Sequence, residues 1–170
     1  MLIITPILPL YLQIRVWRGK EEVERLQERY GKSILKRPKG KLIWIHAASV
    51  GESLSTLPLI DLLVEHDKKT HVLVTTGTIS SAKLMKERLP DRAFHQYAPI
   101  DNSKYVRNFF NAWNPDIGLW TESEFWPNLV IEAKNHGVTI GLIHGRISDK
   151  SFKGWKRLGK MISIILRNFD

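Results

Sequence analysis

Hydrophobic and polar positions follow two alternating periods along the chain. Short apolar runs near residues 42–47, 71–76, 93–97, 116–120 and 138–143 predict buried strands. Apolar residues at helical spacing follow each run and predict helices near residues 50–66, 79–89, 102–113, 125–136 and 151–167. Strands that alternate with helices form βαβ units, so the sequence predicts an α/β fold with a doubly wound parallel sheet.

A carboxylate follows the first predicted strand, in the run Ser49-Val50-Gly51-Glu52. The carboxyl ends of parallel strands are where α/β proteins keep their active sites, so Glu52 is a candidate for chemistry. Ser49 stands three residues before Glu52 and directly before an apolar run, which is also the pattern of a helix capping box. Both interpretations, a cap and a catalytic carboxylate, stay open at this point.

A second acidic cluster follows the fourth predicted strand. The run Pro115–Trp120 is apolar, and Glu122 and Glu124 come directly after it, before Trp126-Pro127. Because such junctions share one edge of a parallel sheet, these carboxylates and Glu52 are expected to converge. The alternative is a helix N-terminus, where acidic residues and proline are both favoured.

The second predicted strand ends in Thr76-Gly77-Thr78. Backbone N–H groups at the start of the next helix can hold an anion there. A glycine between hydroxyl residues also makes an ordinary tight turn and helix cap, and we favour that interpretation. The chain lacks the glycine-rich fingerprints of dinucleotide and P-loop sites.

Composition limits the remaining classes. The 170 residues, 43% of them hydrophobic, suffice for one core, and the absence of cysteine excludes disulfides and cysteine-based metal sites. The six histidines show no metal-ligand spacing, so no metal or cofactor is expected. A net charge of +9 favours an anionic partner, although no nucleic-acid-reading motif accompanies it, so nucleic acid is not expected.

Residues 1–20 are predicted to form a membrane-associated anchor, and residues 21–170 the globular domain. The first fourteen residues carry no charged side chain and precede Arg15, Trp17, Arg18 and Lys20. Fourteen residues are too few for a membrane span, which needs about 20, so an interfacial anchor fits better. The alternative is a buried or partner-docking helix. The helix predicted at 151–167 is basic and amphipathic, which is typical of a solvated face or of membrane docking.

Four segments, HAASVGE, VLVTTGT, ESEFWPNL and RISDKS, together resemble the N-terminal half of the 3-deoxy-D-manno-octulosonic acid (Kdo) transferases. The resemblance extends from about residue 8 to the last residue. It implies that Glu52 is the general base and that Glu122, Glu124, Arg146 and Ser148 support it or bind the acceptor. His144-Gly145 differ from the Asn-Ala of the family motif. The candidate site thus comprises Glu52 with Ser49, Gly51, Thr76, Gly77, Thr78, Glu122, Glu124, Arg146 and Ser148.

The same resemblance implies a Rossmann-like half of a GT-B glycosyltransferase. The implied reaction is inverting transfer of Kdo from CMP-Kdo to a lipid A precursor in lipopolysaccharide synthesis, at the cytoplasmic face of the inner membrane. Anionic lipid and a C-terminal donor-binding domain are the other implied partners. Because CMP-Kdo would bind mainly to that domain, which the 170 residues lack, the chain is expected to be inactive alone. A non-catalytic module that binds anionic lipid, or an unrelated nucleotide-dependent α/β enzyme, remains an alternative.

Overall fold

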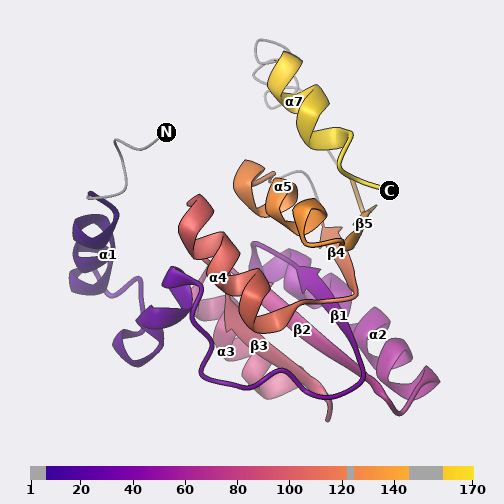
Figure 1. Ribbon diagram of the computed structural model, residues 1–170. Helices are drawn as coiled ribbons and strands as arrows, with labels where there is room; N and C mark the ends of the chain where they lie inside the picture. The colour runs from indigo at the N-terminus through magenta and orange to yellow at the C-terminus, as the bar shows by residue number, and fades with distance from the viewer. Residues whose placement is uncertain (1–6, 122–124, 146–158) are drawn as a thin grey trace.

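The computed structural model describes residues 7–121, 125–145 and 159–170, and its centre is a five-stranded parallel sheet (Figure 1). The strands are β1 (Lys41–His46), β2 (Thr70–Thr76), β3 (Ala93–Tyr97), β4 (Ile117–Thr121) and β5 (Thr139–Ile143). Their order is β3-β2-β1-β4-β5, with every neighbouring pair parallel. This is the strand order of a Rossmann-like sheet, so the predicted α/β fold is confirmed.

Helices cover both faces of the sheet, as a doubly wound fold requires. The sheet-covering helices are α2 (Val50–His66), α3 (Ile79–Arg88), α4 (Ser103–Trp113) and α5 (Pro127–Asn135). The helix α7 (Gly159–Leu166) contacts α5. The predicted last helix began at residue 151, so most of its basic residues lie outside the described part of the chain.

The central strand β1 separates two hydrophobic cores because its side chains alternate between the faces. Leu42 and Trp44 pack with side chains of α4 and α5, whereas Ile43 and Ile45 pack with those of α2 and α3. All four of these side chains are buried. The near-continuous apolar run in the sequence is therefore explained by burial on both faces.

A 3₁₀ helix, η1 (Val23–Tyr30), precedes the sheet and was not predicted. Its sequence, VERLQERY, is mostly charged and polar, and charged residues normally indicate a solvated segment. Several of its charges are instead buried in ion pairs, including those of Glu28 and Arg29. Gly31 ends the helix at φ 73°, and a Cβ there would lie 1.8 Å from the carbonyl oxygen of Tyr105. Glycine is therefore required where η1 packs against α4.

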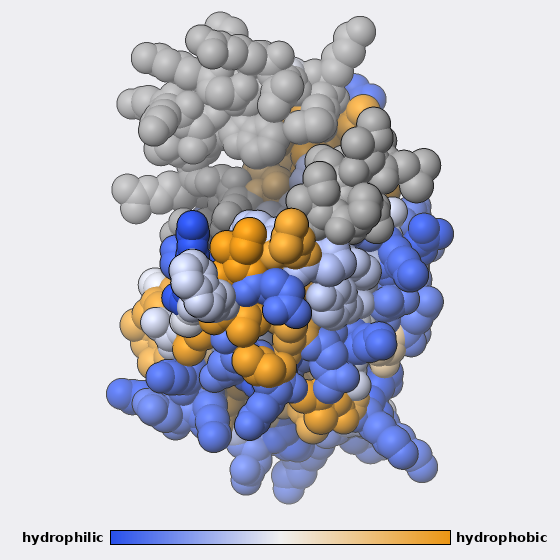
Figure 2. All heavy atoms as spheres, turned by 90° about the vertical axis from the view of Figure 1, so that its left-hand side faces the viewer, coloured by the Kyte–Doolittle hydropathy of each residue, from blue (hydrophilic) through white to orange (hydrophobic). Residues whose placement is uncertain are grey.

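The first helix, α1 (Ile7–Trp17), lies at one side of the molecule in Figure 1. Leu12 is buried, whereas Leu10, Tyr11, Ile14 and Trp17 are exposed. Figure 2 looks at this side and shows apolar side chains gathered on it among hydrophilic ones. Over the described residues, no helix has both the length and the apolar character needed to cross a membrane. The interfacial anchor proposed for residues 1–20 stays a prediction.

Candidate functional site

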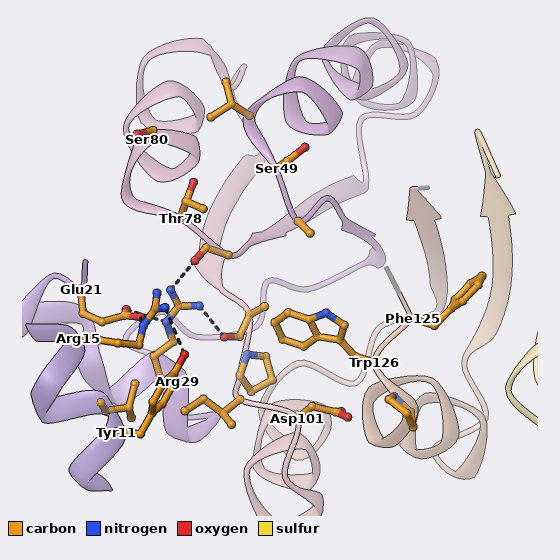
Figure 3. A pocket seen from close by; sticks show the side chains of 18 residues that line it. Tyr11, Arg15, Glu21, Arg29, Ser49, Thr78, Ser80, Asp101, Phe125 and Trp126 are labelled. Carbon is orange, nitrogen blue, oxygen red and sulfur yellow. Dashed lines mark hydrogen bonds and ion pairs between the residues drawn. The ribbon is translucent and has the colours of Figure 1, made fainter. Parts of the chain in front are cut away.

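A cavity of about 920 Å³ opens at the carboxyl edge of the sheet, within the usual range for ligand sites (Figure 3). Its walls come from the loops after β1, β2 and β3, from the start of α5, and from α1 with the segment that follows it. The edge includes the point between β1 and β4 where the strand order reverses. Ligands of open α/β sheets bind at this switch point.

Glu52 lies in the first turn of α2, next to this cavity but not among the residues that line it. Its Oε2 accepts a hydrogen bond from the amide of Ala48 at 2.8 Å. It also lies 3.2 Å from the hydroxyl of Thr121, which shares its one proton between this carboxylate and the carbonyl of His46 at 2.8 Å. Its own amide donates to Oγ of Ser49 at 3.3 Å. The capping interpretation is therefore confirmed, with the carboxylate bonded one residue upstream of the N-cap. The contact to Thr121 also joins the ends of β1 and β4 through this carboxylate.

Of the other residues predicted in these loops, some line the cavity and some do not. Ser49, Gly77 and Thr78 line the cavity. Thr78 caps α3 by accepting a hydrogen bond from the amide of Ser81 at 3.1 Å, so the predicted turn and cap are confirmed. Thr76 is fully buried away from the lining, and Gly51 lies in the first turn of α2 without lining the cavity.

Glu122, Glu124, Arg146 and Ser148 lie outside the described residues. The described residues on either side of the acidic pair do lie at the site. Thr121 ends β4 beside Glu52, while Phe125 and Trp126 line the cavity. In Figure 3 the indole of Trp126 points into the cavity from the side opposite the arginines. The two strand-to-helix junctions therefore meet at one edge, as predicted from the sequence.

A group of two arginines and one glutamate forms the opposite wall, on the left of Figure 3. Glu21 accepts from Nε of Arg15 at 2.6 Å and from Nε of Arg29 at 2.8 Å. The side chains of Glu21 and Arg29 are 2% and 5% exposed. Since one carboxylate balances two guanidinium groups, this wall carries a net positive charge.

Asp101 lines the cavity and caps α5 from a different loop. Its carboxylate accepts hydrogen bonds from the amide of Leu129 at 2.9 Å and from the amide and side chain of Asn128, both at 3.2 Å. The N-cap residue itself, Trp126, supplies no side-chain cap. Burial raises the pKa of Asp101, and the hydrogen bonds from α5 oppose that shift. The contact fixes the segment that carries Trp126 into the cavity.

Two histidines of the sheet, the buried His46 and the half-buried His95, lie close to the site. The ring of His46 lies 4.4 Å from that of Trp120 and 5.3 Å from that of Trp126, and burial lowers the pKa of His46 to about 3. Burial, together with the charges of Arg25 and Arg29, lowers the pKa of His95 to about 3. Both rings are therefore neutral at physiological pH and serve as fixed hydrogen-bonding groups.

Sequence reasoning missed Glu21, Arg29, Asp101 and Thr121 as parts of the site. Their side chains meet residues from 6 to 75 positions away, and no local pattern encodes such contacts. Asn128 carried a weak signal, because it belongs to the ESEFWPNL segment. Across residues 7–121, 125–145 and 159–170, no three histidine, aspartate or glutamate side chains gather as a metal site would require.

Comparison with known proteins identifies the family. A family model described as 3-deoxy-D-manno-octulosonic-acid transferase (kdotransferase) matches residues 24–170. The transferase of Rickettsia bellii is 41% identical over 167 residues, which are 96% of this chain and 40% of that protein. A probable mitochondrial transferase of Arabidopsis thaliana is 36% identical over 169 residues, 98% of this chain and 38% of that protein. The chain thus spans about two fifths of the length of these curated relatives.

A solved structure agrees with the fold. The UDP-GlcNAc 2-epimerase of Neisseria meningitidis superposes with a TM-score of 0.50 and 13% sequence identity, over 73% of this chain and 38% of that one. At this identity the likeness concerns the fold alone. The family model and the relatives, by contrast, cover most of the chain at substantial identity, and on their strength the chain belongs to the 3-deoxy-D-manno-octulosonic acid transferase family.

Proposed function

We propose that this chain is the acceptor-binding half of an inverting GT-B glycosyltransferase that transfers Kdo from CMP-Kdo to a lipid A precursor. One observation carries the proposal. The Glu52 carboxylate is fixed by the Ala48 amide and the Thr121 hydroxyl at the switch point of the sheet, beside a cavity of about 920 Å³. A general base needs both a fixed orientation and a substrate site within reach.

In the proposed reaction, a hydroxyl oxygen of the acceptor sugar attacks the anomeric carbon of Kdo. The new carbon–oxygen bond forms as the bond to the phosphate oxygen of CMP breaks, and CMP leaves with that electron pair. The Glu52 carboxylate takes the hydroxyl proton. Its Oε2 is occupied by Ala48 and Thr121, whereas Oε1 accepts no hydrogen bond from a residue in the described ranges. We therefore assign proton transfer to Oε1.

The cavity suits an amphipathic, anionic acceptor. Phe125, Trp126 and Tyr11 offer ring surfaces to a sugar or to the start of an acyl chain. Arg15 and Arg29 make the opposite wall positive, and the hydroxyl groups of the loops supply hydrogen bonds to sugar oxygens. We assign Glu122, Glu124, Arg146 and Ser148 to the same site on the basis of the sequence motifs.

The N-terminal helix supports a location at the cytoplasmic face of the inner membrane. Leu10, Ile14 and Trp17 are exposed on α1, next to Arg18 and Lys20, a combination that favours an anionic lipid surface. Tyr11 and Arg15 of the same helix line the cavity, so an acceptor embedded in that surface would lie close to the site. We further propose that a C-terminal domain supplies the CMP-Kdo site, that this chain alone is inactive, and that it uses no cofactor and no nucleic acid.

Calorimetric titration of this chain tests the assignment of substrates. In detergent, the chain is titrated with tetraacyl lipid A precursor and, separately, with CMP. Binding of the lipid and not of CMP is expected for an acceptor-binding half. Binding of CMP and not of the lipid would overturn the proposal and favour a nucleotide-dependent enzyme.

Substitution of Glu52 tests its role as the base. In a full-length form of the protein, Glu52→Gln keeps an oxygen that can accept the Ala48 amide but removes the basic group. We expect kcat to fall by about 10²- to 10⁴-fold while the fold and acceptor binding persist. Glu65→Gln, at an exposed position on the same helix, is the matched control and should retain full activity. Unchanged turnover in Glu52→Gln would show that Glu52 is not the base and would favour a lipid-binding role without catalysis for this chain.

A further inference from the structure

We propose that Arg29 is a positioning residue that fixes the backbone holding Glu52. The hydrogen bonds of its guanidinium reach three separate segments. Nε donates to Glu21 at 2.8 Å, Nη2 to the carbonyl of Gly77 at 2.8 Å, and Nη1 to the carbonyl of Ala98 at 3.1 Å. Figure 3 shows these contacts at the wall of the cavity. One side chain therefore sets the spacing of the loops that follow β2 and β3.

The contact with Gly77 continues to Glu52 through the backbone of two residues, Gly77 and Ala48. The amide of Gly77 donates to the carbonyl of Ala48 at 3.3 Å, and the amide of Ala48 donates to Oε2 of Glu52 at 2.8 Å. The carbonyl and the amide of Gly77 belong to neighbouring peptide groups that share its Cα, and the same holds for Ala48, so the link between Arg29 and Glu52 is one of backbone geometry. The orientation of the Ala48 peptide, and through it that of the Glu52 carboxylate, depends on the position of Gly77.

The backbone at Gly77 leaves little room for another arrangement. A Cβ at this residue would lie 3.1 Å from the carbonyl oxygen of Ala48, so the two loops already approach closely. The bond from Gly77 to Ala48 is long at 3.3 Å and bends easily. Among the described residues, only Arg29 donates a hydrogen bond to the carbonyl of Gly77. The arginine therefore supplies the restraint that the weak peptide contact lacks.

Arginine is required because the contact needs a planar fork of donors. The guanidinium lies over the ring of Tyr97, 4.4 Å from its centroid, and donates along three directions in one plane. A lysine at this position could keep the charge beside Glu21 but could not reach both carbonyls from one nitrogen in the same geometry. Glu21 in turn binds Arg15, so the same group also secures α1 to the site.

Amide hydrogen exchange of this 170-residue chain tests the proposal. In Arg29→Lys, which keeps the buried charge, we expect the amides of Ala48 and Gly77 to exchange at least tenfold faster. Core amides such as that of Val74 should change only as far as global stability changes. Arg29→Gln removes the charge as well. It should accelerate exchange of the Ala48 and Gly77 amides in the same way, and it should also lower the global stability more than Arg29→Lys does.

Arg37→Lys is the matched control. Arg37 also donates to several backbone carbonyls, including those of Trp113 and Gly40, and to the carboxylate of Asp116, but at the opposite end of the sheet. Its substitution should leave the Ala48 and Gly77 amides protected. Equal acceleration of site and core amides in Arg29→Lys, or local acceleration in Arg37→Lys, would show that Arg29 contributes only to stability and would overturn the proposal.

The relevance of this positioning to catalysis rests on the proposed function, and the two can fail separately. Titration of the same variants with tetraacyl lipid A precursor gives the second readout. Arg29→Lys is expected to weaken lipid binding by several-fold, and Arg37→Lys to leave it unchanged. If the wild-type chain does not bind the lipid, the proposed function fails, while the exchange experiment still decides whether Arg29 holds the Ala48 and Gly77 amides.

Discussion

Acidification to pH 5 is expected to destabilise this protein through two histidines of the sheet, His46 and His95. The structure fixes the protonation state of His95. Arg25 can only donate, so Nδ1 of His95 accepts at 2.9 Å and the proton sits on Nε2, which donates to Thr76. At His46, Nδ1 is 2.9 Å from the Thr75 hydroxyl, while the buried Nε2 has no hydrogen-bond partner among the described residues, so a second ring proton would have no acceptor there. Both rings are built into the fold in the neutral form.

The sign and size of the effect follow from the pKa values. Each histidine has a pKa of about 3 in the folded chain and an ordinary value of 6.5 when unfolded. Between these pKa values the unfolded state binds more protons than the folded state. The free energy of unfolding is therefore highest above pH 6.5 and falls as the pH decreases toward 3. The loss approaches about 1.4 kcal/mol per pH unit for each histidine and reaches about 2 kcal/mol each by pH 5. Together the two rings remove about 4 kcal/mol.

Urea unfolding followed by tryptophan fluorescence, at several pH values from 7.5 to 5, measures this loss. The range stops at pH 5 because Asp67 and Asp170, whose pKa values are lowered by hydrogen bonds, contribute in more acidic solution. His95→Gln, which offers both a donor and an acceptor, should reduce the pH dependence by about half. His66→Gln changes an exposed ring and is the control: this variant should keep the full pH dependence of the free energy of unfolding. A slope equal in the wild type and in His95→Gln would refute the reasoning.

Three further predictions concern single positions, each measured as the free energy of unfolding in urea. Gly31→Ala should destabilise the chain by more than about 2 kcal/mol, because its Cβ would meet the carbonyl of Tyr105 and its φ is positive; an effect below 1 kcal/mol would contradict the tight packing of η1 on α4. His144→Asn should stabilise it by about 0.5–1 kcal/mol, since His144 has φ 54° and asparagine tolerates that region better; a loss of stability would show that the imidazole has a role of its own. Asp101→Ala should cost about 1–2 kcal/mol through loss of the α5 cap, with Asp101→Asn losing less; equal losses would mean that the carboxylate does not act as a cap.

The layered fold could be predicted because its strands are buried on both faces. Runs such as Lys41–His46 are short, apolar and followed by a helical period, and the structure bounds all five strands within one residue of the prediction. The two junctions that carry Glu52 and Trp126 also meet at one edge as expected, because the carboxyl ends of parallel strands share that edge. A sequence pattern can therefore predict which loops lie together, wherever the parallel order of the strands determines their position.

The cavity wall formed by Arg15, Glu21 and Arg29 could not be predicted in the same way. The sequence of η1 is mostly charged and polar, and the burial of Glu21 before it and of Arg29 within it depends on partners brought together by the rest of the fold. Asp101 likewise caps a helix that begins 26 residues later in the sequence, where no capping motif can be recognised. Such contacts join loops that are set by the sheet, so they become visible only after the sheet is assembled.

The cap and the base interpretations of Glu52 are compatible with each other. The capping contacts occupy Oε2, and they are made by groups at the ends of β1 and β4 that hold the carboxylate in one orientation. A base in a proton transfer needs this restraint, because an unrestrained side chain would lose the benefit of a positioned group. The capping box that argues for a structural role in the sequence is thus the means by which a carboxylate at this switch point acquires the fixed geometry that the proposed chemistry requires.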